Sequence, residues 1–148
     1  MSTANEKIFK ALMLDVGIMS RLCGLHPSAV YSEKDFLNVF RGALSEQFVG
    51  QEMLAATQSP LYYWNREEKN SNAETDFLFE KLNEVIPVEV KSGSYGRLKS
   101  LHLLLETYEN VEEAYVFSSS HEQNTIGGKI SFKPIYTAYA SAKSTKTK

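Results

Sequence analysis

The sequence predicts a mixed α/β domain, in which helices cover the faces of a β-sheet. Apolar residues recur at helical spacing in the first part of the chain and at strand spacing in much of the rest. A second helical pattern over residues 97–108 separates the strand-like segments, so parallel pairing across a helix becomes possible. The length of 148 residues fits one domain with at most a short appended piece.

Residues 1–40 are predicted to form an N-terminal helical segment that packs on a core of residues 41–140. Gly17 should interrupt the first helix, and a second helix should begin near Glu33 or Asp35. The apolar positions at helical spacing are Ile8, Phe9, Leu12, Met13 and Val16.

Within the core, a long buried helix is expected over residues 42–57 and another helix over residues 97–108. The polar residues 65–73 are expected to form a loop, and residues 141–148 a disordered tail. Strands are predicted over short apolar or aromatic runs at 61–64, 75–82, 85–91, 113–118 and 129–136.

Composition limits the function classes. Hydrophobic residues make up 43% of the chain, which is enough for a core and excludes global disorder. The formal net charge of −2 means that any contact with phosphates must come from a local patch. Cys23 is the only cysteine and is expected to be a small buried residue, so an internal disulfide and a cysteine zinc cluster are excluded. No signal peptide or membrane span is evident, and we expect a cytoplasmic protein with no membrane contact.

Two predicted strands carry the residues that could form a catalytic or metal-binding site. Side chains alternate along a strand, so Glu89 and Lys91 should share one face, while Ile86, Val88 and Val90 enter the core. If the strands form a hairpin through Asn83-Glu84, Asp76 can lie beside Glu89. Two carboxylates and an ammonium group would then converge.

Such a group of residues suits Mg²⁺, which prefers oxygen ligands and is often held by one or two carboxylates. The metal would polarise a phosphoryl oxygen, and Lys91 could orient water or neutralise charge on the phosphate. Glu46 has apolar neighbours on its predicted helix, so it needs a partner and could point inward as a fourth member.

Simpler interpretations remain open for these residues. Asp76, Glu89 and Lys91 could be a solvated strand face with a cross-strand ion pair, worth roughly 0.2–1 kcal/mol. Glu46 could be a buried carboxylate bonded to the backbone or to an arginine. The three histidines are far apart and lack HExxH spacing, which argues against a zinc site.

Taken together, several runs resemble a known family over nearly the whole chain. Glu46, Asp76 and Glu89-Val90-Lys91 resemble the D…ExK signature of the PD-(D/E)xK nucleases. The closest likeness is to the uncharacterised C-terminal domain of prokaryotic AAA-type ATPases (domain of unknown function 4143). The matching runs are LDVGI at 14–18, GALSEQFV at 42–49, LYYW at 61–64, ETDF at 74–77, PVEVKSG at 87–93 and PIY at 134–136.

The resemblance implies a restriction-endonuclease-like core with a mixed central sheet flanked by helices. It implies that Asp76, Glu89 and the Val90 carbonyl bind Mg²⁺, that Lys91 serves the attacking water, and that Glu46 completes or orients the site. The implied function is metal-dependent hydrolysis of phosphodiester bonds in nucleic acid. The alternative is an inactive accessory domain of an AAA-type ATPase that docks nucleic acid or protein.

Two features depart from the family pattern. Thr75 precedes Asp76 where the signature has a proline. The family normally carries a P-loop ahead of this domain, but residues 127–130 lack the spacing and the Ser/Thr of that motif. The missing P-loop favours a detached C-terminal piece of such a protein.

Overall fold

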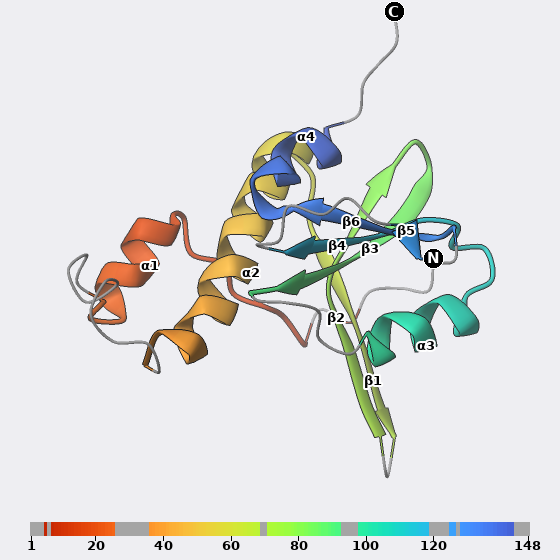
Figure 1. The fold of residues 1–148 in the computed structure, drawn as a ribbon, viewed down its shortest axis with the longest axis horizontal. Coiled ribbons are helices and arrows are strands. Elements are labelled where there is room, and N and C mark those ends of the chain that lie inside the picture. The colour runs from red at the N-terminus through yellow and green to blue at the C-terminus, as the bar shows by residue number, and fades with distance from the viewer. Residues whose placement is uncertain are drawn as a thin grey trace, which may run out of the picture.

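The computed structural model describes residues 5, 7–25, 36–68, 71–92, 98–118, 125–126 and 128–143. Figure 1 shows how their helices and strands are arranged. In chain order these are α1 (Val16–Leu22), α2 (Phe36–Thr57), β1 (Tyr62–Glu68), β2 (Ser71–Lys81), β3 (Glu84–Lys91), α3 (Lys99–Thr107), β4 (Ala114–Ser118), β5 (Thr125–Ile126), β6 (Ile130–Pro134), the 3₁₀ turn η2 (Ile135–Thr137) and α4 (Ala138–Ala142).

The strands form a mixed sheet in the order β1-β2-β3-β4-β6-β5. β1, β2 and β3 pair antiparallel, whereas β4 is parallel to both β3 and β6. The segment between β3 and β4 contains α3, which is the type of helical crossover that parallel neighbours require. The predicted mixed central sheet flanked by helices is therefore confirmed.

The two faces of the sheet carry separate apolar cores because side chains alternate along each strand. One core joins α2 and α4 to the sheet through Val49, Met53, Phe77, Phe79, Ile86, Val88, Tyr115, Phe117, Ala138 and Ala142. The other core joins α3 to the sheet through Leu101, Ala114, Val116, Ile130 and Phe132. β4 is buried along its whole length because it contributes to both cores.

The N-terminal segment differs from the prediction. Residues 8–15 are not helical, and α1 begins only at Val16, where the Asp15 carboxylate accepts hydrogen bonds from the N–H groups of Gly17 and Ile18. Gly17 therefore lies in the first turn of α1 and does not interrupt a helix. The apolar residues predicted to form one helix face do not pack together on one surface, since Ile8 and Phe9 remain exposed. Instead, residues 8–15 belong to no helix or strand, and Met13 is hydrogen-bonded to Gln47 of α2.

Several predicted boundaries are also wrong. The predicted loop at 65–73 belongs mostly to β1 and β2, whose antiparallel ladder pairs the backbone groups of this polar stretch. The two strands extend away from the rest of the sheet (Figure 1). α2 is continuous from Phe36, and the predicted starts at residues 33 and 35 lie outside the described residues.

The C-terminal boundaries shift for a packing reason. The last long strand ends at Pro134, and α4 was not predicted. Ala142 is buried beside α2, so the expected tail cannot begin at residue 141. Residues 144–148 lie outside the described part of the chain. Cys23 is exposed, contrary to expectation, because α1 buries none of its residues and Cys23 follows its last turn.

Candidate functional site

The site forms where β2 separates from β3. The two strands are paired from Lys81↔Glu84 to Phe77↔Val88, after which β2 continues alongside β1 only. Asp76 is the next residue on β2, and its Oδ2 accepts a hydrogen bond of 2.7 Å from the N–H of Val90. The carboxylate thus takes the place of a backbone partner for β3 at the point of separation.

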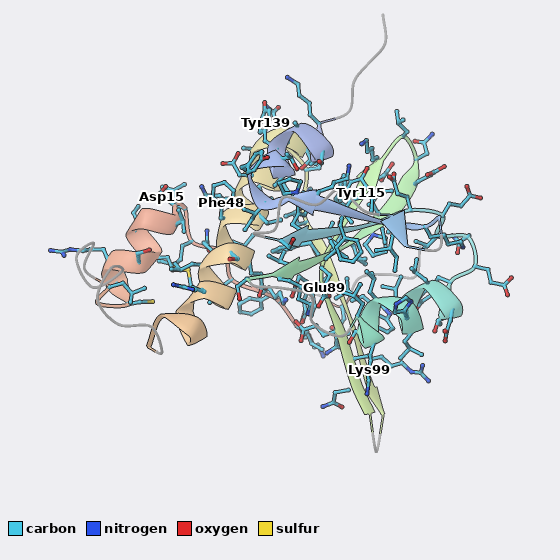
Figure 2. All side chains as sticks on the ribbon, in the orientation of Figure 1. Asp15, Phe48, Glu89, Lys99, Tyr115 and Tyr139 are labelled. Atoms are coloured by element: carbon cyan, nitrogen blue, oxygen red, sulfur yellow. The ribbon has the colours of Figure 1, made fainter. Side chains whose placement is uncertain are left out.

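Glu89 is the most buried carboxylate of the site. Glu89 as a whole residue is 8% exposed and lies in the interior of the molecule (Figure 2). Glu89 Oε1 accepts a hydrogen bond of 2.6 Å from Lys91 Nζ, whereas Glu89 Oε2 is buried and has no hydrogen-bond partner among the residues that the structure describes. A buried carboxylate oxygen without a partner is costly, so this atom is available for a ligand.

Lys10 joins the remaining carboxylates. Its ammonium nitrogen lies 2.8 Å from Glu46 Oε1, 2.8 Å from Glu74 Oε1 and 3.5 Å from Asp76 Oδ1. The same nitrogen lies over the rings of Tyr63 and Phe77, at 5.5 and 5.8 Å from the ring centres. We call Glu46, Glu74, Asp76 and Glu89 the acidic cluster.

The acidic cluster carries excess negative charge. In these ion pairs of the described residues, four carboxylates face the two ammonium groups of Lys10 and Lys91, which leaves two formal negative charges when all groups are ionised. Burial, with the charges of Glu89 and Glu46, raises the pKa of Asp76 to about 6. The Val90 hydrogen bond and the Lys10 charge oppose this rise.

The pKa of Lys10 responds to the same charges. Burial alone would lower it, but the hydrogen bonds to Glu46 and Glu74 and the charges of Asp76 and Glu46 outweigh burial. The net effect raises the pKa of Lys10 above its ordinary value, so this side chain stays a cation at every pH at which the protein would be studied.

The geometry brings together the residues that the sequence singled out. Asp76 and Glu89 are electrostatic neighbours, and Lys91 lies beside Glu89 as their shared strand face predicts. Ile86 and Val88 enter the core, and Val90 packs partly against it. Val90 also provides its N–H to Asp76.

Glu46 has a different partner from those considered. It faces the sheet from α2, and among the described residues its partner is Lys10 and neither an arginine nor a backbone group. Sequence reasoning missed Lys10 and Glu74 as members of the site. The one available signal was a lysine within the apolar run Ile8 to Leu12, where a cation needs a buried partner.

The acidic cluster offers the ligand types that Mg²⁺ prefers. Within the described residues, no group of three or more His, Cys, Asp or Glu side chains is arranged to hold a metal. Mg²⁺ however commonly uses only one or two carboxylates and keeps several waters. Asp76 and Glu89, with the unpartnered Oε2 and the excess negative charge, fit that pattern.

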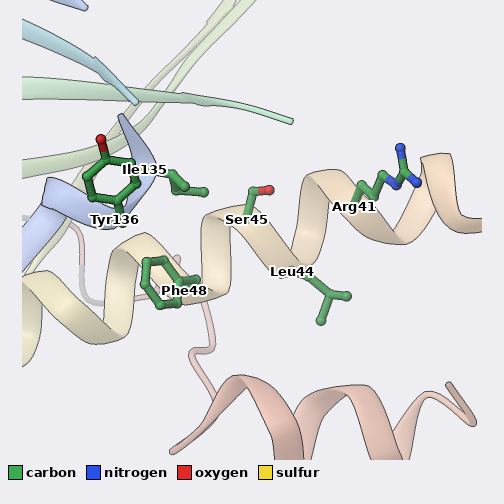
Figure 3. Close-up of a pocket in the computed structure, with 6 residues that line it drawn as sticks. All are labelled: Arg41, Leu44, Ser45, Phe48, Ile135 and Tyr136. Atoms are coloured by element: carbon green, nitrogen blue, oxygen red, sulfur yellow. The ribbon is translucent and has the colours of Figure 1, made fainter. Parts of the chain in front are cut away.

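A shallow hollow lies elsewhere, between α2 and η2, and has a volume of about 280 Å³. Figure 3 shows its largely apolar lining: Arg41, Leu44, Ser45, Phe48, Ile135 and Tyr136. None of the acidic cluster lines this hollow, so it is a separate surface feature.

The fold and the site define a mixed α/β domain with an acidic cluster at the separation of two strands. The family model for a domain of unknown function (DUF4143) matches residues 41–138, and the chain belongs to this family. The matched range contains the whole acidic cluster but not Lys10. No match was found among curated proteins or among solved structures. None of the helices in the described ranges is both long and apolar enough to cross a membrane.

Proposed function

We propose that the acidic cluster is a divalent-cation site that serves phosphodiester hydrolysis of nucleic acid in a PD-(D/E)xK-like arrangement. The observation that carries this proposal is the unpartnered, buried Oε2 of Glu89 beside the Asp76 carboxylate. A hard divalent cation would partner that oxygen and balance the two excess negative charges.

Each residue would have a separate task. Asp76 and Glu89 would hold Mg²⁺, with the Val90 carbonyl as the proposed third ligand from the protein. When bound, Mg²⁺ supplies a Lewis acid for the phosphoryl group. Lys91, held by Glu89 at 2.6 Å, would orient water and offset negative charge on the phosphate. Glu46 would complete or orient the metal site from the side of α2.

The order of elements also supports the proposal. α2 supplies Glu46, the antiparallel hairpin of β2 and β3 supplies Asp76 and Glu89, and α3 then leads into the parallel strand β4. This order keeps the carboxylates on rigid elements on either side of the strand separation. A site on helices and strands is more precisely positioned than a site on loops.

The test is nuclease activity with Mg²⁺ or Mn²⁺ on single-stranded and double-stranded DNA and RNA. Asp76→Asn, Glu89→Gln and Lys91→Met should each lower the rate by at least about a hundredfold, because each removes a ligand or a charge at the reacting phosphate. Glu80→Gln, an exposed residue on β2, and Lys99→Met, an exposed residue on α3, are matched controls that should retain the wild-type rate. Equal activity in all variants would contradict the assigned roles.

A second function is favoured by the ion pairs themselves. Lys10 and Lys91 already neutralise part of the acidic cluster, as they would in a domain whose carboxylates serve only structure. In that case the chain would be an accessory domain that docks nucleic acid or an AAA-type ATPase. Binding of labelled DNA or RNA that does not depend on Mg²⁺, without cleavage, would favour this second function.

A further inference from the structure

We infer that Lys10 is a built-in competitor for the divalent cation, so that the N-terminal segment regulates the affinity of the site. This inference deepens the proposed function and rests on the part of it that concerns cation binding. It assigns a role to a residue outside the family-matched range of residues 41–138.

Lys10 lies among the carboxylates that a divalent cation would use. Its ammonium group contacts three of the four carboxylates of the acidic cluster, at 2.8, 2.8 and 3.5 Å. It thereby places a positive charge 3.5 Å from Asp76 Oδ1, where that charge attracts the carboxylate. A divalent cation that uses Asp76 must either displace this ammonium group or bind at a weakened site.

The segment around Lys10 is attached to α2 by hydrogen bonds. We call residues 8–16 the N-terminal strap. Gln47 of α2 holds it through two hydrogen bonds, since Gln47 Oε1 accepts from Met13 N at 2.9 Å and Gln47 Nε2 donates to Met13 O at 2.7 Å. Gln51 Oε1 accepts a further hydrogen bond of 2.9 Å from Val16 N. These contacts deliver Lys10 to the acidic cluster independently of the cluster's own charges.

The N-terminal strap buries little apolar surface and can therefore be released from α2. Ile8, Phe9 and Leu14 are 50%, 80% and 89% exposed, whereas Leu12 packs against the buried core. Apart from Leu12, few apolar contacts therefore oppose the release of the strap. The Oε2 atom of Glu89 is not reached by Lys10 and stays unpartnered, so the competitor satisfies only part of the acidic cluster.

The experiment measures Mg²⁺ affinity by titration calorimetry in the 148-residue chain. Lys10→Met, which keeps an unbranched side chain without the charge, should bind Mg²⁺ at least about tenfold more tightly than the wild type. Lys7→Met is the matched control, because Lys7 is an exposed lysine in the same part of the chain. It changes the net charge equally and should alter the dissociation constant by less than about twofold.

A double variant locates the gain. In Lys10→Met/Glu89→Gln the increase in affinity should disappear, because the cation loses the carboxylate that Lys10 does not occupy. Thermal unfolding gives a second readout: Mg²⁺ should raise the melting temperature of Lys10→Met by more than that of the wild type. This readout also reports whether each variant folds.

The outcomes separate this inference from the proposed catalysis. Equal Mg²⁺ affinity in the wild type and Lys10→Met, an equal gain in Lys7→Met, or no binding in any variant would overturn the inference. Tighter binding by Lys10→Met without any nucleic-acid cleavage would support the inference and contradict only the hydrolysis. Cleavage that depends on Asp76, with unchanged affinity in Lys10→Met, would leave the proposed function intact and reject the competition.

Discussion

The Asp76 carboxylate accepts a 2.7 Å hydrogen bond from the N–H of Val90 at the point where β2 leaves β3. This bond ties an ionisable group of the candidate site to the backbone that carries Glu89 and Lys91. The position of Asp76 is therefore fixed by the sheet before any ligand is present. The structural role of Asp76 can be separated from its charge.

Two substitutions of Asp76 should separate these roles. Asp76→Asn keeps an oxygen that can accept the Val90 hydrogen bond, whereas Asp76→Ala leaves a partly buried N–H group without this partner. The Asn variant should therefore be more stable than the Ala variant by about 1–3 kcal/mol in denaturant unfolding without added metal. An Ala variant as stable as the Asn variant would show that the hydrogen bond contributes nothing to the fold.

The raised pKa of Asp76 predicts a pH dependence of stability. In the unfolded chain its pKa is near 3.8 and in the folded protein about 6, so the folded state binds the proton more tightly. The ionised carboxylate thus destabilises the fold fully above about pH 6, and this penalty disappears as the pH falls through 6 toward 3.8. The penalty is on the order of 3 kcal/mol.

The measurement is the free energy of unfolding without added metal, compared between the wild type and Asp76→Asn from pH 4 to 8. Asn does not titrate, so the other carboxylates largely cancel in the difference. The stability advantage of Asp76→Asn should be largest above pH 6 and should shrink toward pH 4. A difference that stays constant over this range would refute the raised pKa.

Two glycines of α2 provide a packing test. A Cβ at position 50 would lie 2.8 Å from Leu12 Cδ1 and 2.9 Å from Phe77 Cζ, so Gly50→Ala should destabilise the protein by about 1–3 kcal/mol. Gly42→Ala is the matched control in the same helix, since a Cβ there meets nothing within 4 Å. It should be neutral or stabilising by up to about 1 kcal/mol because alanine favours a helix. Denaturant unfolding of both variants would reject the close packing of the strap if their stabilities were equal.

Gln47 should control the attachment of the N-terminal strap. Gln47→Met keeps the length of the side chain but removes both hydrogen bonds to Met13. Hydrogen exchange of the Met13 amide should become at least about tenfold faster, because loss of the two hydrogen bonds would lower the free energy of opening the strap by about 1–2 kcal/mol. Amides of β3 should keep their wild-type protection. Unchanged exchange at Met13 would mean that other contacts hold the strap.

Local patterns were sufficient to predict much of this fold. The alternation of Ile86 and Val88 with Glu89 gave the correct faces of β3, and the leucine stripe of residues 98–108 gave α3. The pairing of Glu89 with Lys91 follows from the same period of two. These features depend on neighbouring residues in one element, which a sequence displays directly.

The missed features depend on contacts between distant segments. The N-terminal strap is held by Gln47 and Gln51, which lie about 35 residues along the chain from their partners. The apolar spacing in residues 8–16 suggests a helix and cannot reveal that the Gln47 and Gln51 side chains bind the backbone of this segment. The position of Lys10 beside Glu46 and Asp76 is likewise a tertiary contact, and its only local sign was a charge within an apolar run.

The most direct test of the account is a calorimetric titration of the wild type with Mg²⁺, repeated on Glu89→Gln and on the exposed-residue control Glu80→Gln. We expect one saturable site in the wild type and in Glu80→Gln, and the loss of this site in Glu89→Gln. Saturable binding of equal strength in Glu89→Gln, or no binding by the wild type, would contradict a cation site at Asp76 and Glu89.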